Sequence, residues 1–318
     1  MNPMFEKYQG APWFVHTEKD PYAQTSAKVW EELAKLRVKY PMVPGTEMVY
    51  LDDTTPEGIS REDYKAGNNN LFVFKKGTFD SAEIRAKNAD EKRLIFYVHG
   101  GGFVRGNGKY CRVNAINQVQ KIGLSVAACE YRTAPEYKEP CALADVEESY
   151  NFVVNNLGYD PSGIIILGDS AGGTLGLGLC NRLKAQGKKL PGACVWFSPC
   201  LDLTLSFDSH RVNIGKDLFF PKPVAAVIPL FAPDPSRYKN PEVSPYWGDF
   251  AGFPPTYFCV EDTEVFCSDS LEAAAKMHSA GVTVKCHAFH GLWHTFPLTC
   301  PTTPMADVVF QEVKAFIG

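Results

Sequence analysis

The sequence lacks the features of a membrane or exported protein. It contains no apolar run of 18 residues, so a membrane-spanning helix is not expected. Residues 1–10 are polar and carry two charged side chains in place of the apolar core of a signal peptide. The ten cysteines include no Cys-x-x-Cys pair and are scattered along the chain. We therefore expect reduced thiols and a cytoplasmic location.

A concentration of positive charge is also missing. The 318 residues include 32 Lys and Arg against 36 Asp and Glu, which gives a formal net charge of −4. A nucleic-acid partner is not expected, because such proteins present a basic surface. Repeats and low-complexity segments are absent from the sequence, and 45% hydrophobic residues are enough to bury a large core.

The most informative stretch is residues 168–173, which read GDSAGG. It follows an apolar run and precedes a segment with helical character, and Gly-x-Ser-x-Gly in that context is typical of a nucleophile elbow. Gly168 and Gly172 have no Cβ atom to collide with the neighbouring strand and helix. The pattern predicts Ser170 as a nucleophile, with the start of the following helix directed at the oxyanion.

A second glycine motif, HGGG at 99–102, follows the apolar run 94–98. Consecutive glycines leave backbone N–H groups unobstructed, so they can converge on the same oxyanion. We expect Gly101, Gly102 and Ala171 to donate these N–H groups. Either motif alone could be an ordinary turn, but the two in this order, each after a strand, indicate acyl-transfer chemistry.

These motifs together resemble the hormone-sensitive-lipase-like branch of the α/β-hydrolases. The similarity extends to EYRTAPE at 130–136, SPCLDL at 198–203 and Ser-Pro at 244–245, and covers most of the chain from about residue 94 onward. The resemblance implies an α/β-hydrolase fold, with a mainly parallel central sheet flanked by helices and a helical cap. It also implies a serine carboxylesterase that needs no cofactor and no metal.

The periodicity of the chain agrees with this fold class, because strands that alternate with helices form parallel sheets. Expected strands lie at 47–51, 71–75, 94–98, 124–129, 164–167, 193–197, 256–260 and 282–287, and expected helices at 22–40, 110–122, 142–157, 174–184, 224–231, 269–280 and 307–316. Residues 46–98 look antiparallel. We divide the chain into an N-terminal cap segment (1–45), a catalytic domain (46–204 and 246–318) and a cap insertion (205–245).

A serine nucleophile needs a base, and in α/β-hydrolases the chain order is serine, acid, histidine. His294 lies in the sequence GLWHTF, which resembles the histidine loop of the family, and we predict it as the base. His290 is its local rival. His287, His290 and His294 also have the spacing of metal ligands on a helix, but Gly291 interrupts and a strand precedes, so zinc is not expected.

The acid must come from the loop after strand 256–260, which reads EDTEVF. The family usually places its acid two positions before a large apolar residue, and Glu264 stands two positions before Phe266. A glutamate can accept the hydrogen bond that fixes the tautomer of the imidazole. Glu264 is therefore our prediction, with Asp262 and Glu261 as alternatives.

The combined interpretation is a serine esterase acting on small carboxylic esters. Bulky residues expected in the cap, Trp13, Phe14, Phe219 and Phe220, favour short acyl chains because they close a pocket. An amidase, lactamase or decarbamoylase would use the same triad, so the sequence leaves that alternative open. A non-catalytic small-molecule receptor is a further alternative, although such relatives usually lose a triad member. A homodimer is also compatible with the sequence.

Overall fold

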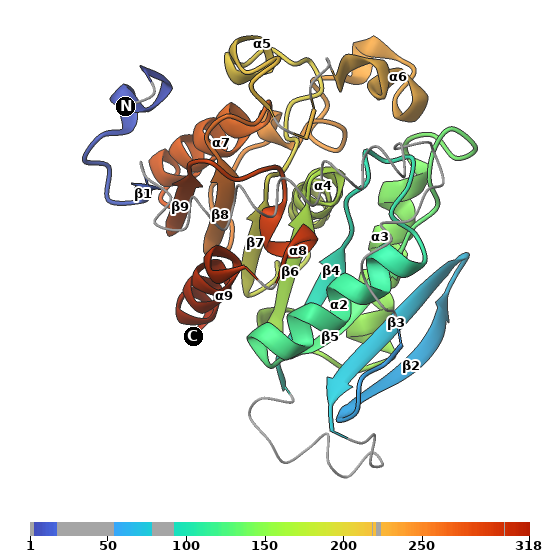
Figure 1. The fold of residues 1–318 in the computed structure, drawn as a ribbon. Coiled ribbons are helices and arrows are strands. Elements are labelled where there is room, and N and C mark those ends of the chain that lie inside the picture. Colours follow the sequence, from blue (N-terminus) through green and yellow to red (C-terminus); the bar gives the residue numbers. More distant parts are fainter. Residues whose placement is uncertain (1–2, 18–53, 78–91, 218, 221–223, 302) are drawn as a thin grey trace, which may run out of the picture.

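A nine-stranded sheet organises the part of the chain that the computed structural model describes, namely residues 3–17, 54–77, 92–217, 219–220, 224–301 and 303–318 (Figure 1). The strand order is β1-β9-β8-β7-β6-β4-β5-β3-β2. Neighbouring strands are parallel except in the β2–β3 and β3–β5 pairs. The strands are β1 (Phe14–Thr17), β2 (Ile59–Ala66), β3 (Asn69–Lys76), β4 (Leu94–Val98), β5 (Ser125–Glu130), β6 (Ile164–Asp169), β7 (Ala193–Phe197), β8 (Thr256–Glu261) and β9 (Val284–Phe289).

Helices cover both faces of this sheet (Figure 1). On one side lie α2 (Lys109–Ile122), α8 (Phe296–Thr299) and α9 (Pro304–Ile317); on the other lie α3 (Cys141–Asn155), α4 (Ala171–Ala185) and α7 (Cys267–Ser279). Strand β4 illustrates how the sequence produces two cores. Phe96 and Val98 point into the core shared with α3 and α4, whereas Ile95 and Tyr97 point into the core shared with α2 and α9.

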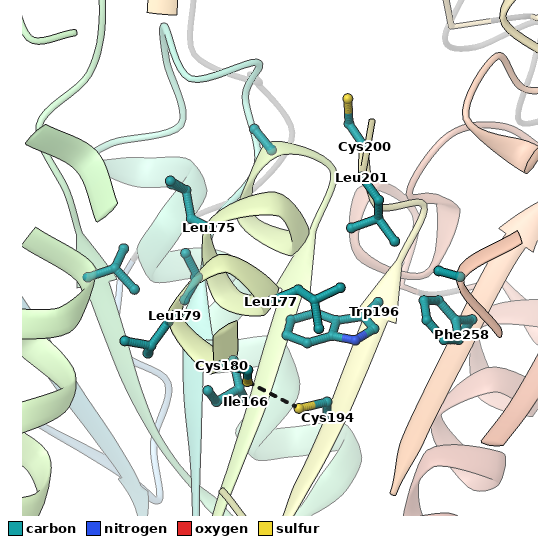
Figure 2. Packing of buried hydrophobic residues seen from close by; sticks show 14 of the residues in the cluster. Ile166, Leu175, Leu177, Leu179, Cys180, Cys194, Trp196, Cys200, Leu201 and Phe258 are labelled. Atoms are coloured by element: carbon teal, nitrogen blue, oxygen red, sulfur yellow. Dashed lines mark hydrogen bonds between the residues drawn. The ribbon is translucent and has the colours of Figure 1, made fainter. Parts of the chain in front are cut away.

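The core beneath α4 positions the start of that helix (Figure 2). Gly176 faces the indole of Trp196 on β7, and a Cβ built at Gly176 would lie 2.7 Å from that ring. The sulfur atoms of Cys180 on α4 and Cys194 on β7 are 3.8 Å apart, and both side chains are fully buried. Side chains of β7 therefore pack against the middle of helix α4 and hold the helix in place over the sheet.

Most expected elements of the catalytic domain are confirmed within a few residues. Two expectations are wrong. Strand β4 pairs in parallel with both β5 and β6, so residues 46–98 are not wholly antiparallel. Strand β2 lies outside the strands expected above, because four of the eight residues in ISREDYKA are charged. It is an edge strand with one face in solvent, which tolerates that charge.

The N-terminal residues 3–17 lie at the edge of the sheet. They form a 3₁₀ helix, η1 (Pro3–Tyr8), and strand β1, which pairs in parallel with β9. Trp13 is buried and its ring lies 6.2 Å from that of His278 on α7. Trp13 and Phe14 therefore belong to the sheet edge, and their expected place in the cap is corrected. The helix expected at 22–40 and the strand at 47–51 lie outside the described residues.

Short helices occupy the region 205–245 above the carboxyl ends of the central strands (Figure 1). They are α5 (Ser209–Val212), η5 (Val224–Ala226), α6 (Ile228–Phe231) and η6 (Pro235–Arg237). A further short helix, η7 (Pro245–Trp247), leads back to the sheet, and η4 (Pro161–Gly163) precedes β6. Among the described residues, no helix combines the length and apolar character that crossing a membrane requires.

Candidate active site

The predicted site residues all follow strands of the same parallel set. Ser170 follows β6, Glu264 follows β8 and His294 follows β9, while the HGGG loop follows β4. Because these four strands run in the same direction, their carboxyl ends lie along one edge of the sheet. In open α/β sheets that edge is where ligands bind.

Ser170 occupies the sharp turn between β6 and α4. Its φ is 52° and its ψ is −121°, a backbone conformation that L-residues rarely adopt. Two glycines make the turn possible. A Cβ at Gly168 would lie 2.6 Å from the carbonyl oxygen of Gly172, and a Cβ at Gly172 would lie 2.0 Å from that of Val98. This is the geometry of a nucleophile elbow, and it follows from the local sequence.

The HGGG loop is left-handed over three consecutive residues. The φ values are 117° at Gly101, 63° at Gly102 and 65° at Phe103. Within the described part of the chain, the N–H groups of Gly101, Gly102 and Ala171 enter no hydrogen bond. The ring of Phe103 stacks on Phe231 of α6 with centroids 3.9 Å apart, so the loop also contacts the expected cap insertion. Three unused N–H groups at this edge could receive an oxyanion.

Asp169 joins the elbow to the glycine loop. Its buried carboxylate accepts hydrogen bonds from the N–H of Gly100 at 2.9 Å, the hydroxyl of Tyr97 at 2.8 Å and the hydroxyl of Tyr110 at 2.7 Å. Burial raises the pKa of Asp169, and the hydrogen bonds from the two tyrosines oppose this shift. The carboxylate thus fixes Gly100 beside Ser170.

His294 and Glu264 lie in direct contact. His294 Nδ1 is 2.5 Å from Glu264 Oε2, and the two side chains are only 2% and 1% exposed. Glu264 Oε1 accepts a hydrogen bond from the N–H of Glu261 at 3.0 Å. Burial raises the pKa of Glu264, and the neighbouring His294 lowers it. The other ring nitrogen, Nε2, is buried and has no hydrogen-bond partner among the described residues, the Ser170 hydroxyl included.

Three phenylalanines enclose the imidazole of His294. The ring centroid of Phe220 lies 4.8 Å away, that of Phe219 5.4 Å and that of Phe266 5.5 Å. Phe219 and Phe220 come from the expected cap insertion, and Phe266 comes from the loop that carries Glu264. An imidazole in such surroundings is shielded from water, which strengthens its interaction with the carboxylate.

The alternative acids face other partners. Asp262 accepts hydrogen bonds from His290 Nδ1 at 2.9 Å and from His16 Nε2 at 3.0 Å. The carboxylate of Glu261 accepts from the N–H groups of Thr263 and Gly291. Burial by itself would raise the pKa of Asp262, but the hydrogen bonds from its two histidines lower it overall. The structure therefore brings neither alternative to His294.

The described residues offer one grouping with the spacing of metal ligands. Glu261, Asp262 and His290 place ligand atoms within 4.8 Å of one another. These carboxylates already accept the hydrogen bonds given above, so the group is satisfied without an ion. The three spaced histidines do not converge on a metal, because His287 contacts Glu312, His290 contacts Asp262 and His294 contacts Glu264.

Sequence reasoning missed three residues that support this site. The Ser198 hydroxyl accepts a hydrogen bond from the N–H of Thr295, directly after His294. The Asn213 amide donates to the carbonyl of Glu264 at 2.9 Å. Asp217 accepts hydrogen bonds from the N–H of Phe219, in the expected cap insertion, and from the N–H of Val265, in the acid loop. Only Ser198 carried a signal, through its place in the SPCLDL motif.

Comparison with known proteins agrees with this geometry. Residues 95–298 match the model of a protein family whose description is "alpha/beta hydrolase fold". The chain belongs to this family. It is 32% identical over 235 residues to an esterase of Acinetobacter venetianus, covering 74% of this chain and 77% of that protein. It is also 32% identical over 233 residues to the carboxylesterase/phospholipase LipF of Mycobacterium tuberculosis, covering 71% of this chain and 61% of LipF.

Solved structures support the same fold. EstE5, soaked with p-nitrophenyl butyrate, superposes with a TM-score of 0.76 at 23% identity, over 94% of this chain and 98% of EstE5. A hormone-sensitive lipase from a metagenome library gives a TM-score of 0.76 at 24% identity, over 92% and 97% of the two chains. The expected α/β-hydrolase fold is confirmed, and the relatives named esterase and carboxylesterase agree with the resemblance to an esterase branch of that family.

Proposed function

We propose that this protein is a serine carboxylesterase that hydrolyses short-chain esters, with Ser170, His294 and Glu264 as its catalytic triad. The observation that carries the triad is the buried contact between His294 Nδ1 and Glu264 Oε2, which leaves Nε2 free. An imidazole held in this way by one nitrogen can take a proton on the other. The relatives named esterase and carboxylesterase support the reaction class.

The proposed reaction begins when Ser170 Oγ attacks the acyl carbon of the ester while its proton moves to His294 Nε2. The N–H groups of Gly101, Gly102 and Ala171 stabilise the negative charge on the carbonyl oxygen. His294 then gives the proton to the departing alcohol, and the acyl group stays on Ser170. A water molecule then attacks the acyl carbon while His294 takes its proton. The bond between the acyl carbon and Ser170 Oγ breaks, His294 returns the proton to that oxygen, and the acid leaves.

The free serine and histidine atoms do not hydrogen-bond to each other before substrate arrives. Catalytic hydrogen bonds are often long in the absence of substrate and tighten in the complex. The negative carboxylate of Glu264 stabilises the imidazolium that forms when Ser170 loses its proton. No step in this scheme requires a metal or a cofactor.

Short acyl chains are supported by Phe219 and Phe220, whose rings pack at His294 and limit the space beside it. The test is hydrolysis of p-nitrophenyl acetate, butyrate and octanoate by the wild type and by Ser170→Ala. We expect rapid turnover of the two shorter esters and its loss in the variant. Folded wild type that hydrolyses none of them would refute the proposal, and a matched amide would then be tried.

We further propose a cytoplasmic location and a homodimer. All ten cysteines are free, and eight of them are buried, as suits a reducing compartment. Thiol titration of denatured protein isolated from its native cells should give ten free thiols, and a disulfide would contradict the location. Sedimentation equilibrium tests the dimer, and a monomer mass across the concentration range would contradict it.

A further inference from the structure

Asp217 is a buried carboxylate that connects two separate segments through their backbones. Its Oδ1 accepts hydrogen bonds from the N–H groups of Phe219 and Phe220, both at 2.7 Å. Its Oδ2 accepts a third, also at 2.7 Å, from the N–H of Val265. The residue is 3% exposed, and no Lys, Arg or His of the described chain forms an ion pair with it.

The residues that donate these hydrogen bonds lie beside His294 or next to its partner Glu264. The first two hold Phe219 and Phe220, whose rings lie 5.4 Å and 4.8 Å from the imidazole. The third holds Val265, the residue directly after Glu264, whose carboxylate contacts Nδ1 of the same imidazole. The carboxylate of Asp217 therefore connects the two phenylalanines that pack on the imidazole of His294 with the loop that carries Glu264.

We propose that Asp217 is a positioning residue of the esterase, which aligns the imidazole of His294 by fixing the cap residues on one side and the Glu264 loop on the other. This inference rests on the proposed triad. A burial cost accompanies any carboxylate that has no cationic partner, and three backbone hydrogen bonds offset it here. The arrangement means that Asp217, Phe219 and Phe220 are part of the catalytic geometry as well as of the cap.

The physical consequence concerns kcat. The imidazole must receive a proton from Ser170 and deliver it to the leaving group, so its orientation matters in the transition state. A misplacement of about 1 Å can lower the rate about a hundredfold. Substrate binding before the reaction does not use this proton transfer, so KM responds less than kcat.

Two variants of Asp217 remove different numbers of its three backbone hydrogen bonds. In Asp217→Asn, the amide oxygen can keep the hydrogen bonds to Phe219 and Phe220, but the NH₂ group cannot accept from Val265. In Asp217→Ala all three are lost. Asp234→Asn is the matched control, because Asp234 also accepts a hydrogen bond from a backbone N–H two residues on, that of Ser236, but is exposed at η6.

We expect Asp217→Asn to lower kcat about tenfold with KM changed less than about twofold, and Asp217→Ala to lower kcat further and raise KM. Asp234→Asn should leave both unchanged. Rates are expressed per active serine, titrated with a phosphonate inhibitor, so that a smaller folded fraction does not imitate a lower kcat. Wild-type kcat per active serine in Asp217→Asn would overturn the proposal.

A variant at Phe220 covers the case in which the Asp217 variants do not fold. Phe220→Leu keeps the backbone hydrogen bond to Asp217 and removes the ring beside His294, so kcat should fall about threefold or more. An unchanged kcat in Phe220→Leu would show that the ring of Phe220 does not align His294, and it would overturn the proposal. Ser170→Ala and Glu264→Gln are measured alongside. If these retain activity, the proposed triad is wrong; if only the Asp217 and Phe220 variants do, the inference alone is wrong.

Discussion

Glu264 and His294 form a buried pair, with Oε2 of the glutamate 2.5 Å from Nδ1 of the imidazole, while Asp262, two residues earlier, pairs with His290. The two carboxylates stand in the same loop and contact different histidines. Because the two carboxylates have different partners, a variant of Asp262 is a direct control for a variant of Glu264, the proposed triad acid.

Glu264→Gln should lower kcat about 1,000- to 10,000-fold with little change in the unfolding midpoint. The amide cannot stabilise an imidazolium, and it favours the wrong tautomer of His294. Asp262→Asn should change kcat less than about threefold. Steady-state kinetics on p-nitrophenyl butyrate measures both, and the assignment fails if Asp262→Asn is the more damaging of the two.

Gly172→Ala should destabilise the fold by about 2 to 3 kcal/mol and abolish activity. The new Cβ would stand 2.0 Å from the carbonyl oxygen of Val98 and 2.6 Å from that of His99, and both atoms belong to the backbone. Gly178→Ala in the same helix is the control, because its Cβ would be 3.1 Å from the nearest backbone oxygen. Urea unfolding of both variants measures the difference, and equal stabilities would contradict it.

Asp169→Asn should destabilise the protein by about 2 kcal/mol and lower kcat. An asparagine offers one acceptor oxygen where the structure presents three donors, from Tyr97, Gly100 and Tyr110. Loss of the negative charge also weakens the hydrogen bond that Asp169 Oδ1 accepts from Gly100, which leads into the oxyanion loop, so the reaction should slow as well. Tyr110→Phe removes a single donor and should cost less on both measures. A fully active Asp169→Asn would show that the loop is held by other contacts.

Lowering the pH should destabilise the folded protein by protonating Glu312. Burial alone would raise the pKa of this carboxyl, but hydrogen bonds from His287, Tyr257 and Lys285 outweigh it and lower the pKa to about 2. Because the folded-state pKa lies below the unfolded value, the charged carboxylate stabilises the folded chain. That contribution, about 1 to 2 kcal/mol, is complete above about pH 4.5 and is lost as the pH falls toward about 2.

Urea unfolding of the wild type and Glu312→Gln across this pH range tests that expectation. The wild type should be more stable than the variant at pH 6, and the gap should narrow steadily below about pH 4.5. A gap that stays constant with pH would mean that the carboxylate acts only through packing.

Much of the fold could be predicted from the sequence because the central strands and helices carry strong local patterns. The strand at Ala193–Phe197 was predicted with the bounds that the structure has, since five consecutive apolar residues suit a strand covered on both faces. Edge elements escaped prediction. The four residues of β1 become a strand only because β9 offers its free edge. Strand β2 carries charged residues, and such a segment does not have the apolar pattern expected of a strand.

The sequence by itself determined the nucleophile elbow and the glycine loop. Their requirement is steric and local: Ser170 needs a strained turn that only neighbouring glycines permit, and so its motif is visible in six consecutive residues. The tertiary structure alone decided which of three nearby acids contacts His294, that Trp13 lies at the sheet edge, and that Asp217 joins Phe219 and Phe220 to the acid loop. Those relationships depend on how distant segments pack, and a one-residue change in a loop's path redirects a side chain without altering any local pattern.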